Sequence, residues 1–283
     1  MDIRDRTVDT AADREPGMRM SSRTESMSDN HYDNDFYEGQ IAGSLRSAVK
    51  YADFLLTIYR PDSIADLGCG RGAWLKAFKD RGVRKVVGYD GSWNEQNNMI
   101  DQAIEFHAVD LNRTIADKTT ERFDLAMSLE VAEHLDASSA SNFIASLTQL
   151  ADVVLFGAAY ANQGGTNHIN EQPHTYWAEI FSRHGYVPYD LFRPVFWGDE
   201  EVEYWYQQNI FLYVKENTPV AGLLSQAGYR PMKNIKFMDC VHPILFDSKL
   251  QQISTKAFIK KLMIRAVPRP LRPLAQKIKR AVT

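Results

Sequence analysis

The apolar positions of the chain first become regular after about residue 32. From there to Tyr59 they recur at spacings of three and four, which is the pattern of one face of an amphipathic helix, and Pro61 ends it. Residues 1–31 mix Asp, Arg, Thr, Ser and Met, with too few large apolar side chains to offset the entropy lost on ordering. The sequence therefore predicts a disordered leader over 1–31, followed by a helix.

Five short apolar segments then alternate with segments of helical pattern. The predicted strands are 63–68, 85–90, 105–110, 123–129 and 153–157. The predicted helices between and after them include 73–81, 139–150 and 176–184. This alternation predicts an α/β fold with a mostly parallel sheet and helices on both faces.

The pattern changes after residue 186. Residues 187–197 and 208–215 are rich in aromatic and β-branched side chains, and only the turn-like acidic stretch 198–203 separates them. Two strands that are close in sequence, without an evident crossover helix, predict an antiparallel pair at the edge of the sheet.

A glycine-rich turn follows the first predicted strand. Asp66 leads into glycines at 68, 70 and 72, a GxGxG spacing that differs from both the GxGxxG dinucleotide fingerprint and the GxxxxGK phosphate loop. Asp90 ends the next predicted strand, where a carboxylate can accept hydrogen bonds from both hydroxyls of a ribose. The turn and Asp90 together predict a nucleoside-containing ligand, and the alternative is a structural turn without a ligand.

Over residues 32–216 the sequence resembles the class I S-adenosylmethionine-dependent methyltransferases, whose first motif is an acidic residue followed by GxGxG. The resemblance implies a Rossmann-like, seven-stranded sheet whose last strand is antiparallel. It also implies the following cofactor-binding residues: Asp66, Gly68, Gly70, Gly72, Asp90, Trp93, Asp110, Leu111 and Glu130. The alternatives are a helix N-cap for Asp110 and surface packing for Trp93.

A second group of polar residues follows the fourth predicted strand. Glu130, Glu133 and His134 are spaced i, i+3, i+4, so they share one face if the segment turns helically. Two carboxylates and an imidazole suit a divalent metal or a proton transfer.

More histidines lie in the polar stretch 164–174, after the fifth predicted strand. This arrangement resembles metal-dependent O-methyltransferases, and the stretch itself resembles methyltransferases of bacterial glycan biosynthesis. The resemblance implies a Mg or Mn site formed by Glu130, Glu133, His134 and His168, with His174 as an alternative ligand. The predicted catalytic residues are His134, His168 and Glu171, which would assist deprotonation of the acceptor. The alternatives are helix capping beside the cofactor loop and ordinary loop hydrogen bonds.

Aromatic residues cluster near the end of this region. They are Tyr176, Trp177, Trp197, Tyr204, Trp205 and Tyr206. A cluster of this kind is compatible with a platform for a carbohydrate, and the alternative is core packing between the last helix and the edge strands.

The composition is that of a globular protein, with 44% hydrophobic and 24% charged residues among 283. Only two cysteines are present, Cys69 and Cys240, and no apolar run approaches the length needed to cross a bilayer. These features predict a cytoplasmic location.

The net charge of −3 conceals two oppositely charged parts. Ten of the 33 basic residues and none of the 36 acidic ones lie in 248–283, which leaves −13 on 1–247 and +10 on this tail. Apolar residues interleave with the basic ones, and prolines at 268, 270 and 273 predict two short helices. We expect the tail to contact an anionic membrane surface peripherally, at its inner face. Docking on the acidic body is the alternative, and nucleic acid ranks third because no known binding module is present.

These observations predict a methyltransferase domain over 32–247 and a basic amphipathic extension over 248–283. The predicted function is S-adenosylmethionine-dependent O-methylation of a hydroxyl on a sugar or glycan, with a metal assisting. The alternatives are O-methylation of a small aromatic or quinone-like metabolite, and a non-catalytic scaffold that binds the cofactor.

Overall fold

The computed structural model describes residues 27–115 and 119–266. The chain divides into two units, Met1–Gln40 and Ile41–Thr283. Of the first unit only the beginning of helix α1 (Met27–Ile58) is described. The predicted disordered leader thus lies outside the described residues, apart from 27–31, which are helical. The sections below concern the second unit.

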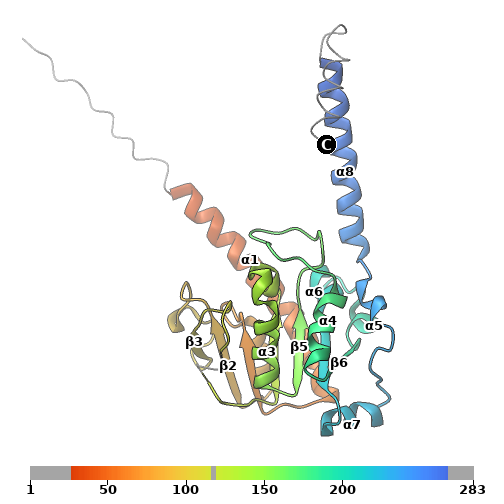
Figure 1. The fold of residues 1–283 in the computed structure, drawn as a ribbon. Coiled ribbons are helices and arrows are strands. Elements are labelled where there is room, and N and C mark those ends of the chain that lie inside the picture. The colour runs from red at the N-terminus through yellow and green to blue at the C-terminus, as the bar shows by residue number, and fades with distance from the viewer. Residues whose placement is uncertain (1–26, 116–118, 267–283) are drawn as a thin grey trace, which may run out of the picture. The chain divides into compact units, whose positions relative to one another are not determined.

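Seven strands form one sheet in the order β3-β2-β1-β4-β5-β7-β6 (Figure 1). They are β1 (Ser63–Leu67), β2 (Lys85–Asp90), β3 (Glu105–Ala108), β4 (Leu125–Leu129), β5 (Val153–Gly157), β6 (Tyr186–Tyr189) and β7 (Phe211–Lys215). The first five pair in parallel, whereas β7 runs antiparallel to both β5 and β6. The predicted seven-stranded sheet with an antiparallel edge pair is confirmed.

Helices cover both faces of this sheet. The described helices besides α1 are α2 (Ala73–Lys79), α3 (Ala140–Leu150), α4 (His174–Arg183), α5 (Arg193–Phe196), α6 (Tyr204–Asn209), α7 (Pro219–Gln226) and α8 (Pro243–Ala266). Of these, α8 contributes no residue to the two cores beside the sheet. One buried core combines residues of α1, α2, α5 and α6 with alternate strand residues such as Leu155, and the other combines α3 and α4 with the intervening residues such as Phe156. Figure 1 shows α3 and α4 lying over one face of the strands. Because both faces are covered, the central strands carry apolar side chains almost throughout.

The strand order of the sheet reverses its direction between β1 and β4. The chain adds β2 and β3 on one side of β1 and then returns to add β4 and β5 on the other. The carboxyl ends of β1 and β4 are joined by the Ser128 hydroxyl, which donates to the Leu67 carbonyl at 2.7 Å. In open α/β sheets, ligands bind in the crevice at such a reversal.

The segment between β6 and β7 differs from the prediction of two adjoining strands. The first strand ends at Tyr189, and α5 and α6 lie between β6 and β7. Phe192 and Phe196, four residues apart, both stack on Tyr51 of α1, with ring centroids 4.8 and 4.6 Å away. Short aromatic runs suit either a strand or a buried helical turn, and here packing against α1 selects the turn.

The predicted basic tail is described only in part. The predicted tail from residue 248 belongs to one continuous helix, α8, up to Ala266. The three prolines that were expected to break it lie outside the described residues. Among the described helices, none combines the length and the apolar composition that crossing a bilayer requires.

Replacing Tyr51 by Phe tests how α1 is held. The hydroxyl of this fully buried residue donates to the Tyr206 carbonyl of α6 at 2.8 Å. Since Tyr51→Phe removes the donor of a buried carbonyl, we expect urea denaturation to show a loss of about 1–2 kcal/mol in unfolding free energy. Tyr59→Phe is the control, because the hydroxyl of Tyr59 donates to the Asp124 carbonyl at the surface, where water can replace it. Equal losses in the two variants would contradict this assignment.

Candidate active site

Three glycines with left-handed backbone angles form the turn after β1. Their φ values are +87° at Gly68, +52° at Gly70 and +84° at Gly72. A Cβ at Gly68 would lie 2.3 Å from Cγ2 of Val131, whereas a Cβ at Gly70 would project into open space. The turn therefore packs closely against the segment after β4 on one side and leaves room for a ligand at Gly70.

Asp90, at the end of β2, is held against this turn. One carboxylate oxygen accepts a hydrogen bond from the Gly70 N–H and the other from the Gly91 N–H, both at 2.7 Å. The side-chain amide of Asn94 donates to the Gly70 carbonyl at 2.6 Å and fixes the same turn from the other side. The structure thus brings Asp90 and the glycine turn together.

Two buried carboxylates, Asp66 and Asp90, lie at this turn. Burial raises the pKa of Asp66 well above its usual value, and the nearby Asp90 raises it further. Burial also raises the pKa of Asp90, and hydrogen bonds from Gly70, Gly91 and Trp93 oppose this rise. A cationic ligand such as an ammonium or a sulfonium would favour the charged forms of both carboxylates and lower their pKa values again.

The other predicted cofactor residues lie at the border of the pocket. Trp93 is 70% exposed, and its indole lies so close to Gly91 that a Cβ there would be 2.6 Å from it. The carboxylate of Asp110 is exposed and accepts a hydrogen bond from the Asn112 N–H at 3.0 Å. This is a turn rather than the helix N-cap that was the alternative. Leu111 is buried in the core, so contact of Asp110 and Leu111 with an adenine stays a prediction.

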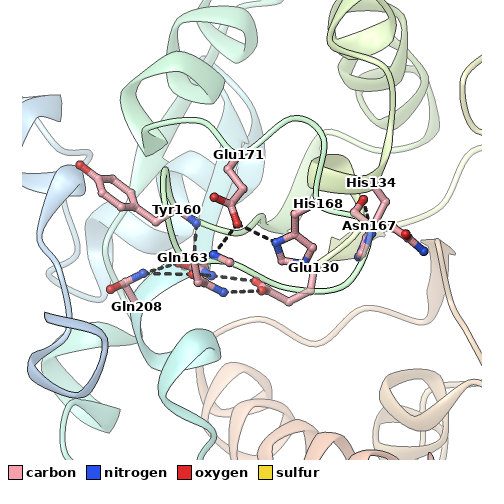
Figure 2. Close-up of polar contacts among 10 residues, drawn as sticks. Glu130, His134, Tyr160, Gln163, Asn167, His168, Glu171 and Gln208 are labelled. Carbon is pink, nitrogen blue, oxygen red and sulfur yellow. Dashed lines mark hydrogen bonds and ion pairs between the residues drawn. The ribbon is translucent and has the colours of Figure 1, made fainter. Parts of the chain in front are cut away.

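Glu130 follows β4 directly and was predicted to share a helical face with Glu133 and His134. Its φ is +57°, and the short 3₁₀ turn Ala132–His134 begins two residues later. Its carboxylate accepts hydrogen bonds from Asn209 at 2.9 Å and Gln163 at 3.3 Å (Figure 2). Burial raises its pKa to about 7. Glu130 therefore lies outside the helical turn that contains Glu133 and His134, and the expectation that all three share one helical face is wrong.

Glu133 is the most unusual carboxylate of the structure. Its exposed fraction is 0%, and neither oxygen has a hydrogen-bond partner of good geometry among the described residues. Burial and the neighbouring Glu130 raise its pKa well above the usual value, and the backbone N–H groups of Glu133 and Ala159 lower it only in part. A buried carboxylate without a partner destabilises the fold, so its presence here points to a ligand that the side chain serves.

Two histidines lie beside Glu133. His134 and His168 meet edge to face with ring centroids 4.7 Å apart. Ligand atoms of Glu133, His134 and His168 all lie within 4.8 Å of one another, which is a spacing that could hold a metal ion. Glu130, the fourth predicted ligand, is not part of this group.

The loop that carries His168 is tied down at several points. The Glu133 carbonyl accepts hydrogen bonds from the N–H groups of Ile169 and Asn170, both at 2.9 Å. Glu171 accepts from the Gly164 N–H at 2.6 Å and binds Nδ1 of His168 at 2.8 Å, as Figure 2 shows. With Nδ1 engaged, Nε2 of His168 is the nitrogen left for a ligand.

His174 is not brought to this group. It is buried on α4, where Nδ1 pairs with the Met238 carbonyl at 2.8 Å and Nε2 with the side-chain oxygen of Asn209 at 3.1 Å. Burial lowers its pKa. Because both nitrogens are already bonded within the protein, His174 has a structural role and does not serve as the alternative metal ligand.

The predicted aromatic cluster contains both buried and partly exposed side chains. Trp177 is buried against Phe156, with ring centroids 5.4 Å apart, and Tyr206 is buried against Trp74. These contacts agree with the alternative of core packing. Trp197 and Tyr204 remain partly exposed around the buried His242.

A buried amide network was not foreseen from the sequence. Gln163, Gln208 and Asn209 bond to one another, and Gln163 and Asn209 hold Glu130. The signal in the sequence is the polar pair at 208–209, which interrupts a segment that was otherwise expected to be an apolar strand. Polar residues buried at a strand end require partners, and these partners orient Glu130.

Comparison with known proteins identifies the family of the chain. A family model described as a methyltransferase domain matches residues 37–190, which is more than half of the chain. No curated protein is similar enough in sequence to count as a match.

Three solved structures illustrate the likeness in fold. An O-methyltransferase family protein from Burkholderia thailandensis is 15% identical with a TM-score of 0.50, and the match covers 68% of this chain and 61% of that one. DesVI from Streptomyces venezuelae is 14% identical (TM-score 0.49; 68% and 100% covered). Magnesium protoporphyrin IX methyltransferase from Synechocystis PCC 6803, solved with bound S-adenosylmethionine, is 16% identical (TM-score 0.46; 69% and 87% covered).

At 15% identity, the Burkholderia protein shows a shared fold alone. The match spans 61% of the length of that protein. The family match rests on sequence and includes the glycine turn, Asp90, and the segment from Glu130 to His168. The chain therefore belongs to the family that this model describes, the methyltransferase-domain family.

Proposed function

We propose that the protein transfers a methyl group from S-adenosylmethionine to a hydroxyl oxygen of a sugar or glycan, with a divalent cation held by Glu133, His134 and His168. The observation that carries this proposal is the buried carboxylate of Glu133, which has no hydrogen-bond partner of good geometry among the described residues and lies beside two histidines. This group follows β4, and the cofactor turn follows the neighbouring β1. A methyl donor and an activated hydroxyl need this proximity.

The cofactor pocket fits S-adenosylmethionine in its chemistry. The Asp90 carboxylate stands where ribose hydroxyls can donate to it, and Asp66 supplies a second negative group for the cationic part of the cofactor. The open space at Gly70 is where a ligand can approach the backbone closely. When bound, the cofactor supplies a sulfonium whose methyl group is electrophilic.

The three proposed metal ligands also fit a divalent cation. Carboxylate and imidazole are ligands that Mg²⁺, Mn²⁺ and Zn²⁺ accept, and the Glu133 oxygens have no other partner of good geometry among the described residues. Glu171 orients the ring of His168, as carboxylates commonly do for metal-bound histidines. Gly165 leaves space for Nε2 of His168, since a Cβ there would lie 2.3 Å from this nitrogen. A cation held here would lower the pKa of a coordinated hydroxyl.

Different residues would bind the methyl donor and activate the acceptor. Asp66, Asp90 and the glycine turn position the methyl donor. With a cation bound, His134 and His168 would hold it through their imidazole nitrogens, and the coordinated hydroxyl would lose its proton to solvent. Without a cation, a neutral imidazole of either residue can take that proton instead. Burial and the neighbouring His168 lower the pKa of His134, so its neutral form dominates at neutral pH. The polar loop 160–173 is suited to a hydroxyl-rich acceptor because its amide groups offer both donors and acceptors.

The acceptor is tested with methyl-labelled S-adenosylmethionine and fractionated cell extract. We expect label in a polysaccharide or a glycan conjugate. Label in a small aromatic or quinone-like fraction instead would overturn the choice of acceptor. Binding of the cofactor without transfer to any fraction would support the scaffold alternative.

Asp90→Asn tests the cofactor pocket. Loss of the charged acceptor weakens two hydrogen bonds to the ribose, and we expect the Kd for S-adenosylmethionine to rise about 10–100-fold in calorimetry. Because burial raises the pKa of Asp90, affinity of the wild type should fall as the pH drops through that raised pKa, at a higher pH than for an exposed aspartate. Asp80→Asn is the control, since Asp80 is exposed and pairs with Lys76 on α2. Equal affinity of both variants would contradict the assignment.

Glu133→Gln tests the metal site without an acceptor. In EDTA the substitution removes a buried acid that lacks partners, and we expect the unfolding free energy to rise by about 1–3 kcal/mol. Added Mn²⁺ should stabilise the wild type in thermal melts and leave the variant unchanged. His168→Gln should likewise lose the Mn²⁺ response, whereas His184→Gln, at an exposed position after α4, should keep it. A wild type whose melting temperature is indifferent to Mn²⁺ would rule out the metal.

A further inference from the structure

Helix α8 exposes an unusual number of large apolar side chains. The exposed fractions are 54% for Ile244, 55% for Phe246, 46% for Leu250, 63% for Ile253 and 63% for Phe258. Single exposed apolar residues are ordinary, but five within fifteen positions of one helix indicate a surface that another apolar phase covers. No part of the chain that the structure describes covers them.

Part of this apolar surface is organised along the helix. Phe246, Leu250 and Ile253 are spaced i, i+4, i+7 and therefore form one stripe. Lys249 and Lys256 lie to one side of this stripe on the helical wheel. An apolar stripe flanked by lysines is typical of helices that lie in the interface of a lipid bilayer.

The charge of the segment selects the partner. Asp247 is the only acidic residue of α8, and from 248 to the last residue there are ten basic residues and no acidic one. Two copies of this segment would repel each other, which disfavours pairing with a second chain. An anionic lipid surface supplies both the opposite charge and the apolar layer.

The beginning of α8 is fixed to the domain by specific contacts. Asp239 accepts a hydrogen bond from the Thr175 hydroxyl at 2.8 Å, and the His242 N–H donates to the Gln208 side chain at 2.6 Å. Leu245, in the first turn, is 3% exposed. One turn further, Nζ of Lys249 lies 3.3 Å from the position that a Cβ on Gly164 would occupy. The helix therefore starts beside the loop that carries Glu171 and His168.

From these observations we infer that α8 is a docking element that binds an anionic bilayer through Phe246, Leu250 and Ile253, with Lys249 and Lys256 at the headgroups. Docking through this helix would bring the acceptor loop to the lipid surface. The docking itself does not depend on the identity of the acceptor, so it can be tested apart from methyl transfer.

The test is flotation of the full chain with vesicles. We expect binding to vesicles of phosphatidylcholine and phosphatidylglycerol, weak binding to phosphatidylcholine alone, and weakening by salt as the Debye length shrinks. Replacing Phe246, Leu250 and Ile253 together by Ser should reduce the bound fraction at least about tenfold, since burial of these side chains supplies the apolar part of the affinity. Lys249→Glu with Lys256→Glu should lower binding to the anionic vesicles only.

The control replaces Gln251, Gln252 and Thr255 by Ser, which changes the same helix away from the stripe. Circular dichroism and S-adenosylmethionine affinity establish that each variant is folded. A second measurement uses Phe246→Trp, whose emission should shift to shorter wavelength on addition of anionic vesicles.

Three results would overturn the inference. One is equal flotation of the wild type and the triple stripe variant, and another is equal binding to neutral and anionic vesicles. The third is a dimer in light scattering that the stripe substitutions dissociate, which would assign the stripe to a second copy of the chain. None of these outcomes bears on the proposed methyl transfer, which is measured separately.

Discussion

The site depends on one constraint, the burial of a parallel sheet between two layers of helices. Every residue of β4 is buried, and β1 is nearly the same. Strands of this kind have almost no interior position at which an exposed polar side chain can stand, so the chemistry gathers where the strands end. Asp90 after β2, the glycine turn after β1 and Glu130 to His134 after β4 are consequences of this single constraint.

At the carboxyl end of β4, the backbone conformation of Glu130 places Glu130 and Glu133 in two different environments. A left-handed residue at the end of β4 turns one carboxylate toward the amides of Gln163 and Asn209. Glu133, after the turn, lies beside the histidines instead, without amide partners. A residue other than glycine with φ near +57° is strained, and strain of this kind persists where surrounding contacts hold it. Here the Glu130 N–H is bonded to the Gly157 carbonyl, which fixes the turn to β5.

The sequence predicted what depends on periodicity and on local turn chemistry. The parallel strands, the GxGxG turn and the approach of Asp90 follow from hydrophobic segments, glycine positions and strand ends. It also singled out Glu133, His134 and His168, which the structure brings together. The helical turns at 193–196 and 204–209 could not be predicted in the same way, because their aromatic residues are selected by contact with α1, far away in the chain. The roles of His174 and Glu130 depend on Asn209 and Met238, and no local pattern contains such distant partners.

The amide network has a consequence for how the protein is made. Glu130 is held by Asn209, and Gln208 beside it is bonded to His242. Strand β7, which follows these amides directly, inserts between β5 and β6, both of which precede it in the chain. A ribosome must therefore release most of the chain before Glu130 can meet its partners, and long-range contacts of this kind form slowly. A nascent chain that ends with the matched region, at residue 190, contains the glycine turn and Asp90 but lacks Gln208 and Asn209. The environment of Glu130 is thus completed only after residues 208–209 have been synthesised.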